Sequence, residues 1–233
     1  MLWKAAVPFA QSSPVVAGGR VYVTAGDGDR LVTIAFDAAT GREAWRRSLA
    51  RSRAHQIYKT NDPASPTPAA DEHGVVVFFA DVGLAAYAPD GTPQWTLPLG
   101  PFRNFYGMAG SPIIAGDAVI LVCDQMSGSF MLALDRRTGR ERWRRARPGS
   151  TVSWTTPMVF APGGSAESQL IVLSSTRLDG YALATGLKAG AQWEVLGVND
   201  LGDEIHATPA LSGGRIYVRT RDALYCFGAA AKS

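Results

Sequence analysis

Short apolar runs alternate with turn-forming residues along the whole chain. In residues 14–46, runs rich in Val, Ile, Leu, Phe and Tyr are separated by turns rich in Gly and Asp. This pattern predicts four β-strands, at 14–17, 20–24, 31–36 and 43–46. The apolar runs are all well below the roughly 18 residues of a membrane-spanning helix, so we expect no transmembrane segment.

The strand pattern repeats five times. Each repeat opens with a small residue followed by proline, and the prolines are 54, 44, 45 and 52 residues apart. Four of the repeats close on a tryptophan, at spacings of 50, 48 and 50 residues. The opening residues are Pro14, Pro68, Pro112, Pro157 and Pro209, and the closing residues are Trp45, Trp95, Trp143 and Trp193. A period of this length, built from short strands, is typical of the blades of a β-propeller.

We therefore predict an all-β fold, a single-domain β-propeller over residues 1–233 with five four-stranded antiparallel blades. The blades are expected at residues 12–49, 65–99, 110–147, 155–197 and 207–228. The fifth repeat ends before a closing strand, whereas residues 2–7, with Trp3, precede the first repeat. If the chain is read as a circle, Pro209 and Trp3 are as far apart as Pro68 and Trp95. Residues 2–7 are thus expected to complete the last blade and to close the ring, which removes open sheet edges.

A turn of the form Asp-x-x-Thr-Gly precedes two of the closing tryptophans, at residues 37–41 and 135–139. Gly41 and Gly139 are expected to adopt a left-handed conformation that other residues disfavour. The tryptophans are expected to fill the grooves between neighbouring blades. The fourth repeat lacks the aspartate, and its irregular segment 187–197 marks a place where part of a longer ring could have been deleted.

The units 36–45 and 134–143, together with the small-residue–proline openings, resemble the pyrroloquinoline quinone (PQQ)-like propeller repeat. The resemblance covers residues 2–228. It implies either a non-enzymatic scaffold, similar to the BamB-like outer-membrane assembly factors, or a quinoprotein alcohol or sugar dehydrogenase. Members of the family usually have more than five blades. The BamB-like members imply a periplasmic or other extracytoplasmic location, whereas residues 1–5 do not form a signal peptide and would place a complete chain in the cytoplasm.

The residues that quinoprotein chemistry requires are not found in the sequence. Cys123 and Cys226 are 103 positions apart, so they cannot form the vicinal disulfide of the alcohol-oxidising members, and we expect both to be reduced and buried. The string at 26–29, Gly-Asp-Gly-Asp, is interpreted as an ordinary turn rather than a calcium loop. His55, His73 and His206 lack metal-ligand spacing, although a convergence of the first and last at the ring centre stays open. We predict a non-enzymatic protein without cofactor or metal; the alternatives are a quinoprotein relative and an extracytoplasmic sensor or ligand-binding module of a larger protein.

The net charge of +3 and the pI near 9.0 come largely from arginine, and seven arginines lie between residues 136 and 147. We interpret this cluster as a solvated rim, with a basic patch for an acidic partner as the alternative. Aromatic residues are not interleaved with the arginines in the way that a single-strand binder needs, so no sequence-specific nucleic-acid binding is expected.

The segments that link one blade to the next, at 51–64, 100–110, 147–155 and 197–207, are the best candidates for a binding face. They are rich in Tyr, Trp, Arg and Asn, the residue types favoured at the centres of protein interfaces. The links contribute His55, Tyr58, Arg103, Asn104, Tyr106, Trp154 and His206 to the predicted face, and the loops that join second to third strands add Arg177 and Arg221. We expect a protein partner and a monomeric chain. The alternative is that Phe105, Tyr106 and Trp154 plug the hub of the ring.

Overall fold

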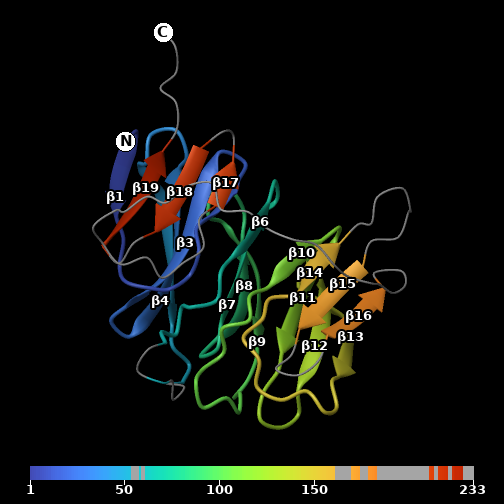
Figure 1. The fold of residues 1–233 in the computed structure, drawn as a ribbon. Coiled ribbons are helices and arrows are strands. Elements are labelled where there is room, and N and C mark those ends of the chain that lie inside the picture. Colours follow the sequence, from blue (N-terminus) through green and yellow to red (C-terminus); the bar gives the residue numbers. More distant parts are fainter. Residues whose placement is uncertain are drawn as a thin grey trace, which may run out of the picture.

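Every regular element in the described part of the computed structural model is a β-strand (Figure 1). The structure describes residues 1–53, 58, 61–160, 169–173, 178–182, 210–212, 215–219 and 222–227. Among these residues, no helix is long and apolar enough to cross a membrane.

The strands of the described residues form five antiparallel sheets, each built mainly from consecutive strands of the chain. The first sheet contains β2 (Val15–Ala17), β3 (Arg20–Asp27), β4 (Arg30–Asp37) and β5 (Glu43–Ala50). The second contains β6 (Ala69–Asp71), β7 (Gly74–Phe79), β8 (Gly83–Tyr87) and β9 (Pro93–Pro98). The third contains β10 (Ile113–Ala115), β11 (Ala118–Cys123), β12 (Phe130–Asp135) and β13 (Glu141–Ala146). The fourth contains β14 (Met158–Phe160), β15 (Gln169–Leu173) and β16 (Leu178–Ala182), and the last contains β17 (Ala210–Ser212), β18 (Arg215–Arg219), β19 (Ala223–Phe227) and β1 (Trp3–Ala6).

The N-terminal strand completes the last sheet, as the circular reading of the repeat predicted. β1 pairs antiparallel with β19, with Trp3 opposite Cys226 and Ala6 opposite Ala223. The backbone N–H of Leu2 extends the ladder by donating to the carbonyl of Cys226 at 3.2 Å. The two ends of the chain are therefore joined in one four-stranded sheet.

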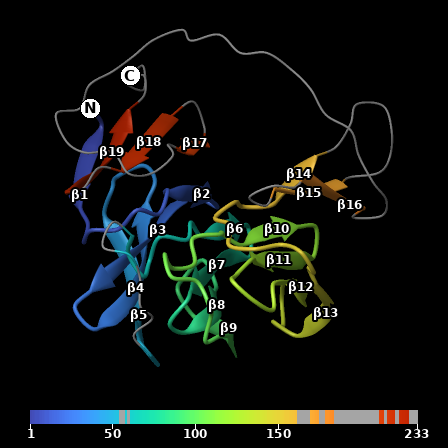
Figure 2. The ribbon, with the colours of Figure 1, turned by 60° about the horizontal axis from the view of Figure 1, so that its bottom comes forward.

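The sheets follow one another in chain order, and Figure 2 shows their short first strands side by side. These first strands contact each other in the order β17, β2, β6, β10. The third and fourth sheets share a hydrophobic cluster in which Ile120 and Met131 pack with Leu170 and Val172. Four-stranded antiparallel sheets in such a series are consistent with propeller blades. The predicted fourth outer strand with Trp193, the opener Pro209 and the irregular segment 187–197 lie outside the described residues.

Trp45, which closes the first repeat, docks on the turn of the next sheet. The indole N–H of Trp45 donates to the carbonyl of Pro89 at 2.9 Å, and a Cβ on Gly91 would come within 2.8 Å of the indole ring. The turn containing Gly91 is one residue shorter than the Asp-x-x-Thr-Gly turns, yet it keeps the left-handed glycine, at φ 85°. The glycine is thus required both by the turn and by the neighbouring ring.

The same docking joins two further pairs of sheets. Trp3 packs on Gly41 and donates to the carbonyl of Ala38 at 3.2 Å. Trp95 packs on Gly139 and donates to the carbonyl of Arg136 at 3.0 Å. The expectation that the tryptophans fill the grooves between sheets is confirmed for these three.

The small residue before each opening proline forms a ladder of hydrogen bonds from sheet to sheet. The backbone N–H of Ser13 donates to Oγ1 of Thr67 at 3.0 Å, and that of Thr67 donates to Oγ of Ser111 at 2.8 Å. The N–H of Ser111 in turn donates to Oγ1 of Thr156 at 3.2 Å. A hydroxyl at this position therefore satisfies a backbone donor of the preceding sheet, which explains why serine and threonine precede these prolines.

Both cysteines are buried and free, as expected. Burial raises the pKa of the Cys123 thiol, so it is protonated at neutral pH. Gly28 lies at φ 60° in the tight turn between β3 and β4, in agreement with the interpretation of residues 26–29 as a turn.

Candidate functional site

Four aromatic side chains from three different links meet on one face of the molecule. We call Tyr58, Phe105, Tyr106 and Trp154 the aromatic cluster, and the face that carries the links 51–64, 100–110 and 147–155 the link face. The ring of Tyr106 lies at the centre, with its centroid 5.6 Å from Tyr58, 5.4 Å from Phe105 and 5.6 Å from Trp154. All three contacts are edge-to-face, the arrangement that aromatic pairs prefer.

The cluster is exposed although its rings support one another. The four side chains keep between 42% and 54% of their surface accessible. Exposed apolar groups of this size usually lie apart on a soluble protein, and a contiguous group marks an interaction site. The alternative that Phe105, Tyr106 and Trp154 plug the hub is not tested, because the remaining link, 197–207, lies outside the described residues.

Buried residues hold the central link in place. Phe102 packs edge-on against Phe78 of β7, with centroids 5.6 Å apart. Asn104 is 3% exposed, and its Oδ1 accepts the N–H of Tyr106 at 3.1 Å. We predicted Asn104 as a member of the binding face; it is instead a buried turn residue that positions Tyr106.

Hydrogen bonds tie the link 51–64 to the same platform. Nδ2 of Asn61 donates to the carbonyl of Tyr106 at 2.8 Å. The buried carboxylate of Asp62 accepts the N–H of Gln11 at 2.8 Å and that of Ala64 at 2.7 Å. The aromatic cluster therefore stands on backbone that is fixed from below.

A hollow of about 280 Å³ opens at the cluster. Its lining is aromatic and amide in character: Gln11, Tyr58, Asn61, Tyr106, Ala109 and Trp154. The walls are thus flat apolar rings with a few polar atoms between them, which is the usual composition of a recognition groove.

The structure brings together three of the predicted face residues, namely Tyr58, Tyr106 and Trp154. Arg103 lies beside them in sequence and is exposed, with Nη1 donating to Oγ of Ser127 at 3.3 Å. Four predicted members lie outside the described residues: His55, Arg177, His206 and Arg221. The open question of a convergence of the two histidines is untested for the same reason.

Sequence reasoning left Phe105, Asn61 and Gln11 out of the predicted face. Phe105 and Asn61 carry a usable signal, because both lie in the links. Gln11 lies outside the links, but it precedes Pro14 by three positions, as Trp154 precedes Pro157, so the register of the repeat places the two at equivalent positions beside the hollow.

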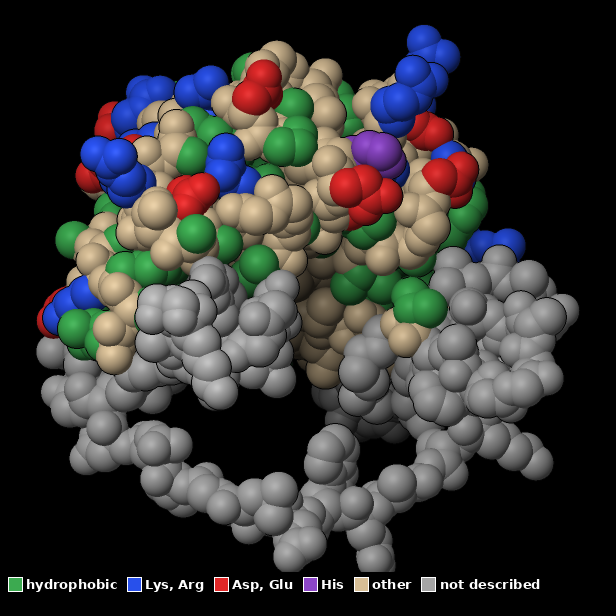
Figure 3. Space-filling model, turned by 90° about the horizontal axis from the view of Figure 1, so that it is seen from above, with side chains coloured by type: hydrophobic (Ala, Val, Ile, Leu, Met, Phe, Trp, Pro, Cys, Tyr) green, Lys and Arg blue, Asp and Glu red, His purple; other side chains and the backbone are tan. Residues whose placement is uncertain are grey.

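The opposite face carries the turns that join the first strand of a sheet to the second and the third strand to the fourth. We call it the hairpin face. Figure 3 looks down on it, at the top of Figure 1, and shows acidic and basic side chains lying beside one another. Arg136, 4% exposed in its side chain, reaches from the third sheet to Asp71 of β6. Its Nε and Nη2 donate to the two carboxylate oxygens at 3.0 and 2.8 Å, which is a bidentate ion pair.

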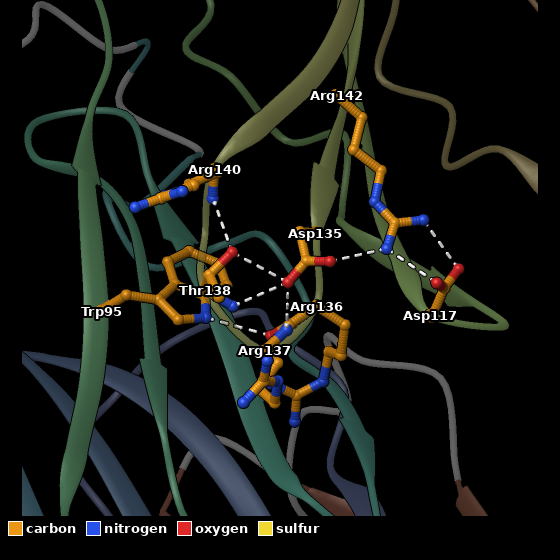
Figure 4. A network of polar contacts seen from close by, with 8 residues as sticks. All are labelled: Trp95, Asp117, Asp135, Arg136, Arg137, Thr138, Arg140 and Arg142. Carbon is orange, nitrogen blue, oxygen red and sulfur yellow. Dashed lines mark hydrogen bonds and ion pairs between the residues drawn. The ribbon is translucent and has the colours of Figure 1, made fainter.

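A second arginine of this face holds two carboxylates, as Figure 4 shows. Arg142 donates to both oxygens of Asp117 at 2.7 Å and to Asp135 at 2.6 Å. The bonds from Arg142 and Thr138 hold the pKa of Asp135 well below its usual range, and Arg142 likewise lowers the pKa of Asp117. These groups are ionised and matched at neutral pH.

Four of the seven arginines at 136–147 pair with carboxylates of the chain, and two of these four are buried. Arg136 is buried, and Arg147 forms a second buried pair, with Nε 2.8 Å from Oδ1 of Asp124. The interpretation of the whole cluster as a solvated rim is wrong for these two residues, because the topology of the sheets supplies them with buried carboxylates. The exposed members whose side chains have no partner among the described residues are Arg137, Arg140 and Arg145.

The hollow at the inner ends of the sheets does not match the needs of a quinone site. It measures about 470 Å³ and is lined by hydroxyl, proline and aliphatic groups: Ser13, Thr67, Pro68, Ala69, Ala70, Ser111, Pro112, Ile113, Ile114 and Thr156. A calcium ion that polarises a quinone needs carboxylate and amide side-chain oxygens. None of these lining residues supplies one, so the described part of the hub does not fit that cofactor. Among the described residues there is also no cluster of His, Cys, Asp and Glu that could hold a metal ion.

Comparison with known proteins gives a family match. The family model described as outer membrane protein assembly factor BamB matches residues 1–192. None of the curated proteins compared with the chain matches it.

Solved structures resemble the chain in fold. A europium-containing methanol dehydrogenase has a TM-score of 0.52 at 15% identity and is matched over 64% of this chain and 27% of its own. The quinohemoprotein alcohol dehydrogenase ADHIIG from Pseudomonas putida HK5 has a TM-score of 0.52 at 24% identity, over 64% of this chain and 23% of its own. BamB from Moraxella catarrhalis has a TM-score of 0.45 at 16% identity, over 97% of this chain and 63% of its own. The chain thus spans about a quarter of the length of the two dehydrogenases.

Proposed function

The chain belongs to the family of BamB-like PQQ-repeat β-propellers, and from this premise we propose that it is a non-catalytic scaffold that binds a protein partner on the link face. The family model is named for an assembly factor, and it matches residues 1–192 of this chain. The proposal includes an extracytoplasmic location, which the family resemblance favours.

The aromatic cluster is the observation that carries the proposal. Tyrosine and tryptophan at the centre of an interface contribute a large share of binding energy, because they bury much apolar surface at a small entropic cost. The rings at 58, 106 and 154 are presented on a fixed platform and remain about half exposed. A partner would bury them without first having to order them, which lowers the cost of binding.

The quinoprotein alternative has less support. Cys123 and Cys226 lie in different sheets, on β11 and β19, and the described hub residues do not match a calcium-bound quinone. Thermal unfolding with PQQ and Ca²⁺ added, together with a dye-linked alcohol or sugar oxidation assay, tests this directly. We expect no shift and no turnover, and turnover would overturn the non-catalytic assignment.

Site-specific photo-crosslinking tests the link face. A photo-reactive phenylalanine analogue in place of Tyr106 should capture a partner in the source organism, whereas the same analogue in place of Arg137 on the hairpin face should not. The captured protein, once purified, should bind the wild-type chain and bind the variants Tyr106→Ala and Trp154→Ala at least about tenfold more weakly. Equal binding to the variants would contradict the proposal.

A further inference from the structure

The carboxylates of the link face over the second and third sheets are all used inside the protein. The links 51–64, 100–110 and 147–155 and the loops after β7 and β11 contain three of them, Asp62, Asp81 and Asp124, which are 8%, 0% and 1% exposed. Asp62 accepts backbone N–H groups. Nε of Arg51 lies 2.6 Å from Oδ2 of Asp81, and Arg147 pairs with Asp124. This part of the link face therefore presents no accessible negative side chain.

Positive side chains of the same region are not neutralised in this way. Arg103 is exposed, and its Nη1 donates to the hydroxyl of Ser127 at 3.3 Å. Arg53 is half-buried, and its Nη2 donates to the carbonyl of Leu99 at 2.8 Å. Neither guanidinium has a carboxylate partner among the described residues. The link 51–64 also contains Lys59, which lies outside the described residues. The region thus has a surplus of positive charge.

The exposed arginine is fixed beside exposed apolar side chains. The N–H of Arg103 donates to Oε1 of Gln125 at 2.7 Å, and the N–H of Met126 donates to the carbonyl of Arg103 at 2.8 Å. These bonds hold the link 100–110 against the loop after β11. Met126 is 66% exposed, and Phe105, the member of the aromatic cluster nearest in sequence to Arg103, is 54% exposed. Positive charge and apolar surface therefore lie on adjoining, hydrogen-bonded backbone.

The charge surplus belongs to the part of the link face that carries the aromatic cluster. In the first sheet, the turn between β3 and β4 exposes Asp27 and Asp29 beside Arg30, so its charges are mixed. Opposite charges across an interface speed encounter and exclude partners of the wrong sign. Arginine can in addition bind a carboxylate through two parallel hydrogen bonds. A partner with carboxylates next to an apolar side chain has the chemistry that complements the second and third sheets.

The shape of the site favours a segment of protein over a membrane surface. The hollow of about 280 Å³ lies between aromatic rings and the amide side chains of Gln11 and Asn61. A concave site with a few polar groups encloses a single side chain and fixes its orientation. Binding to a bilayer instead needs an apolar face that enters the headgroup region. The link face places its amides and rings around a depression, which suits a side chain of a peptide.

We propose that the link face binds an acidic segment of a protein partner. An apolar side chain of the segment occupies the hollow beside Tyr106 and Trp154, and a carboxylate of the segment pairs with Arg103. This proposal rests on the proposed function, because it names the chemistry of the partner that the scaffold would take.

Selection from a phage-displayed library of random peptides tests the proposal without assuming a sequence. The full wild-type chain is the bait, and passage over the Tyr106→Ala chain removes peptides that bind elsewhere. We expect the retained peptides to be rich in Asp and Glu beside an aromatic or aliphatic residue, and poor in Lys and Arg. Retained peptides without net negative charge would overturn the proposal, and so would a selection that retains none.

Fluorescence anisotropy with the tightest selected peptide measures the contribution of the charge. Arg103→Ala should weaken binding by up to about fivefold, the value of an exposed ion pair, and Arg103→Glu by about tenfold or more. The matched control, Arg137→Glu on the hairpin face, changes the net charge equally and should leave the affinity within about twofold. Thermal unfolding shows that each variant is folded. Equal effects of the two reversals would contradict a local pairing with Arg103.

A charge exchange distinguishes pairing from a structural role of the arginine. A second peptide carries lysine in place of each Asp and Glu of the first. It should bind the wild-type chain at least about tenfold more weakly than the first, and Arg103→Glu should restore part of the loss. A purely structural role of Arg103 predicts no such recovery, so its absence would contradict the proposed contact.

The remaining outcomes separate this proposal from the proposed function. Sedimentation with vesicles of phosphatidylcholine and phosphatidylglycerol should leave the chain in solution. Sedimentation that Tyr106→Ala abolishes would overturn the proposal in favour of an anionic lipid surface. If the crosslinker at position 106 captures a protein through a segment that is not acidic, the charge assignment is wrong but the scaffold function is supported. Equal binding of the captured protein to wild type and Tyr106→Ala would count against the scaffold function itself.

Discussion

The link face and the hairpin face use their aromatic residues in opposite ways. On the hairpin face, Trp95 donates to the neighbouring turn, and Arg136 is paired with Asp71 across the same two sheets. On the link face, Tyr106 and Trp154 are half exposed and their donors have no partner among the described residues. Buried ion pairs occur on both faces, because Arg147 at the start of the link 147–155 is paired with Asp124, whereas the exposed rings lie on the link face. A concentration of charge along the chain is therefore a weaker sign of a binding surface than a few rigid groups without partners.

The largest expected effect on stability comes from replacing a tryptophan by alanine at a buried position and, for comparison, at an exposed position of the link face. Trp45→Ala removes a side chain that is 7% exposed and breaks its bond to the turn of the second sheet, so it should lower the free energy of unfolding by about 3–5 kcal/mol. Trp154→Ala, at 47% exposure, should lower it by less than about 1 kcal/mol. Urea unfolding followed by circular dichroism measures both. Similar losses in the two variants would show that the faces do not differ in this way.

The docking of the tryptophans also shows what the sequence could predict. Repeated spacing predicted the four-stranded sheets, a closing strand within residues 2–7 and the left-handed conformation of Gly41 and Gly139, because all of these follow from local periodicity. The acceptor of each indole could not be predicted, because the Trp45 N–H bonds to a carbonyl 44 positions away. Such partners depend on how one sheet is set against the next.

The arginines give the next largest effect. Arg136→Ala leaves the carboxylate of Asp71 in a largely buried place without its partner, so it should cost about 3 kcal/mol of stability. The matched control, Arg137→Ala, removes an exposed arginine from the same turn and should change stability by less than about 0.5 kcal/mol.

A double variant sharpens this result. Combining Asp71→Asn with Arg136→Ala removes the unpaired charge as well, so part of the lost stability should return. Additive losses in the double variant would mean that the two side chains do not act as a pair. The sequence alone could not reveal this pairing, because Asp71 and Arg136 are 65 positions apart and lie in different repeats.

A smaller effect is expected from the hydroxyl ladder at the start of the first strands. Thr67→Val keeps the shape of the side chain but leaves the N–H of Ser13 without its acceptor, which should cost about 1 kcal/mol. Thr67→Ser retains the hydroxyl and should be close to wild type. Thermal unfolding measures both, and equal losses would assign the effect to the methyl group instead of the hydrogen bond.

The sequence predicted which segments carry the candidate site, but not which residues of those segments are exposed. The links were expected to carry the binding residues, and Tyr58, Tyr106 and Trp154 do meet there. Their residue types gave no indication of which would be buried, so Asn104 was placed on the surface although its side chain serves the backbone of Tyr106. Contacts between three separate links exist only once the sheets are assembled.

The smallest expected effect on stability belongs to the centre of the link face. Tyr106→Ala removes a ring that is 47% exposed, and the turn beneath it is held by backbone and Asn104 rather than by the ring itself. Its free energy of unfolding should therefore change by less than about 1 kcal/mol, while partner binding falls at least about tenfold. Denaturant unfolding and a binding isotherm on the same preparation measure the two quantities together. A loss of stability as large as that of Trp45→Ala would make Tyr106 a structural residue, and the contrast between the two faces would no longer hold.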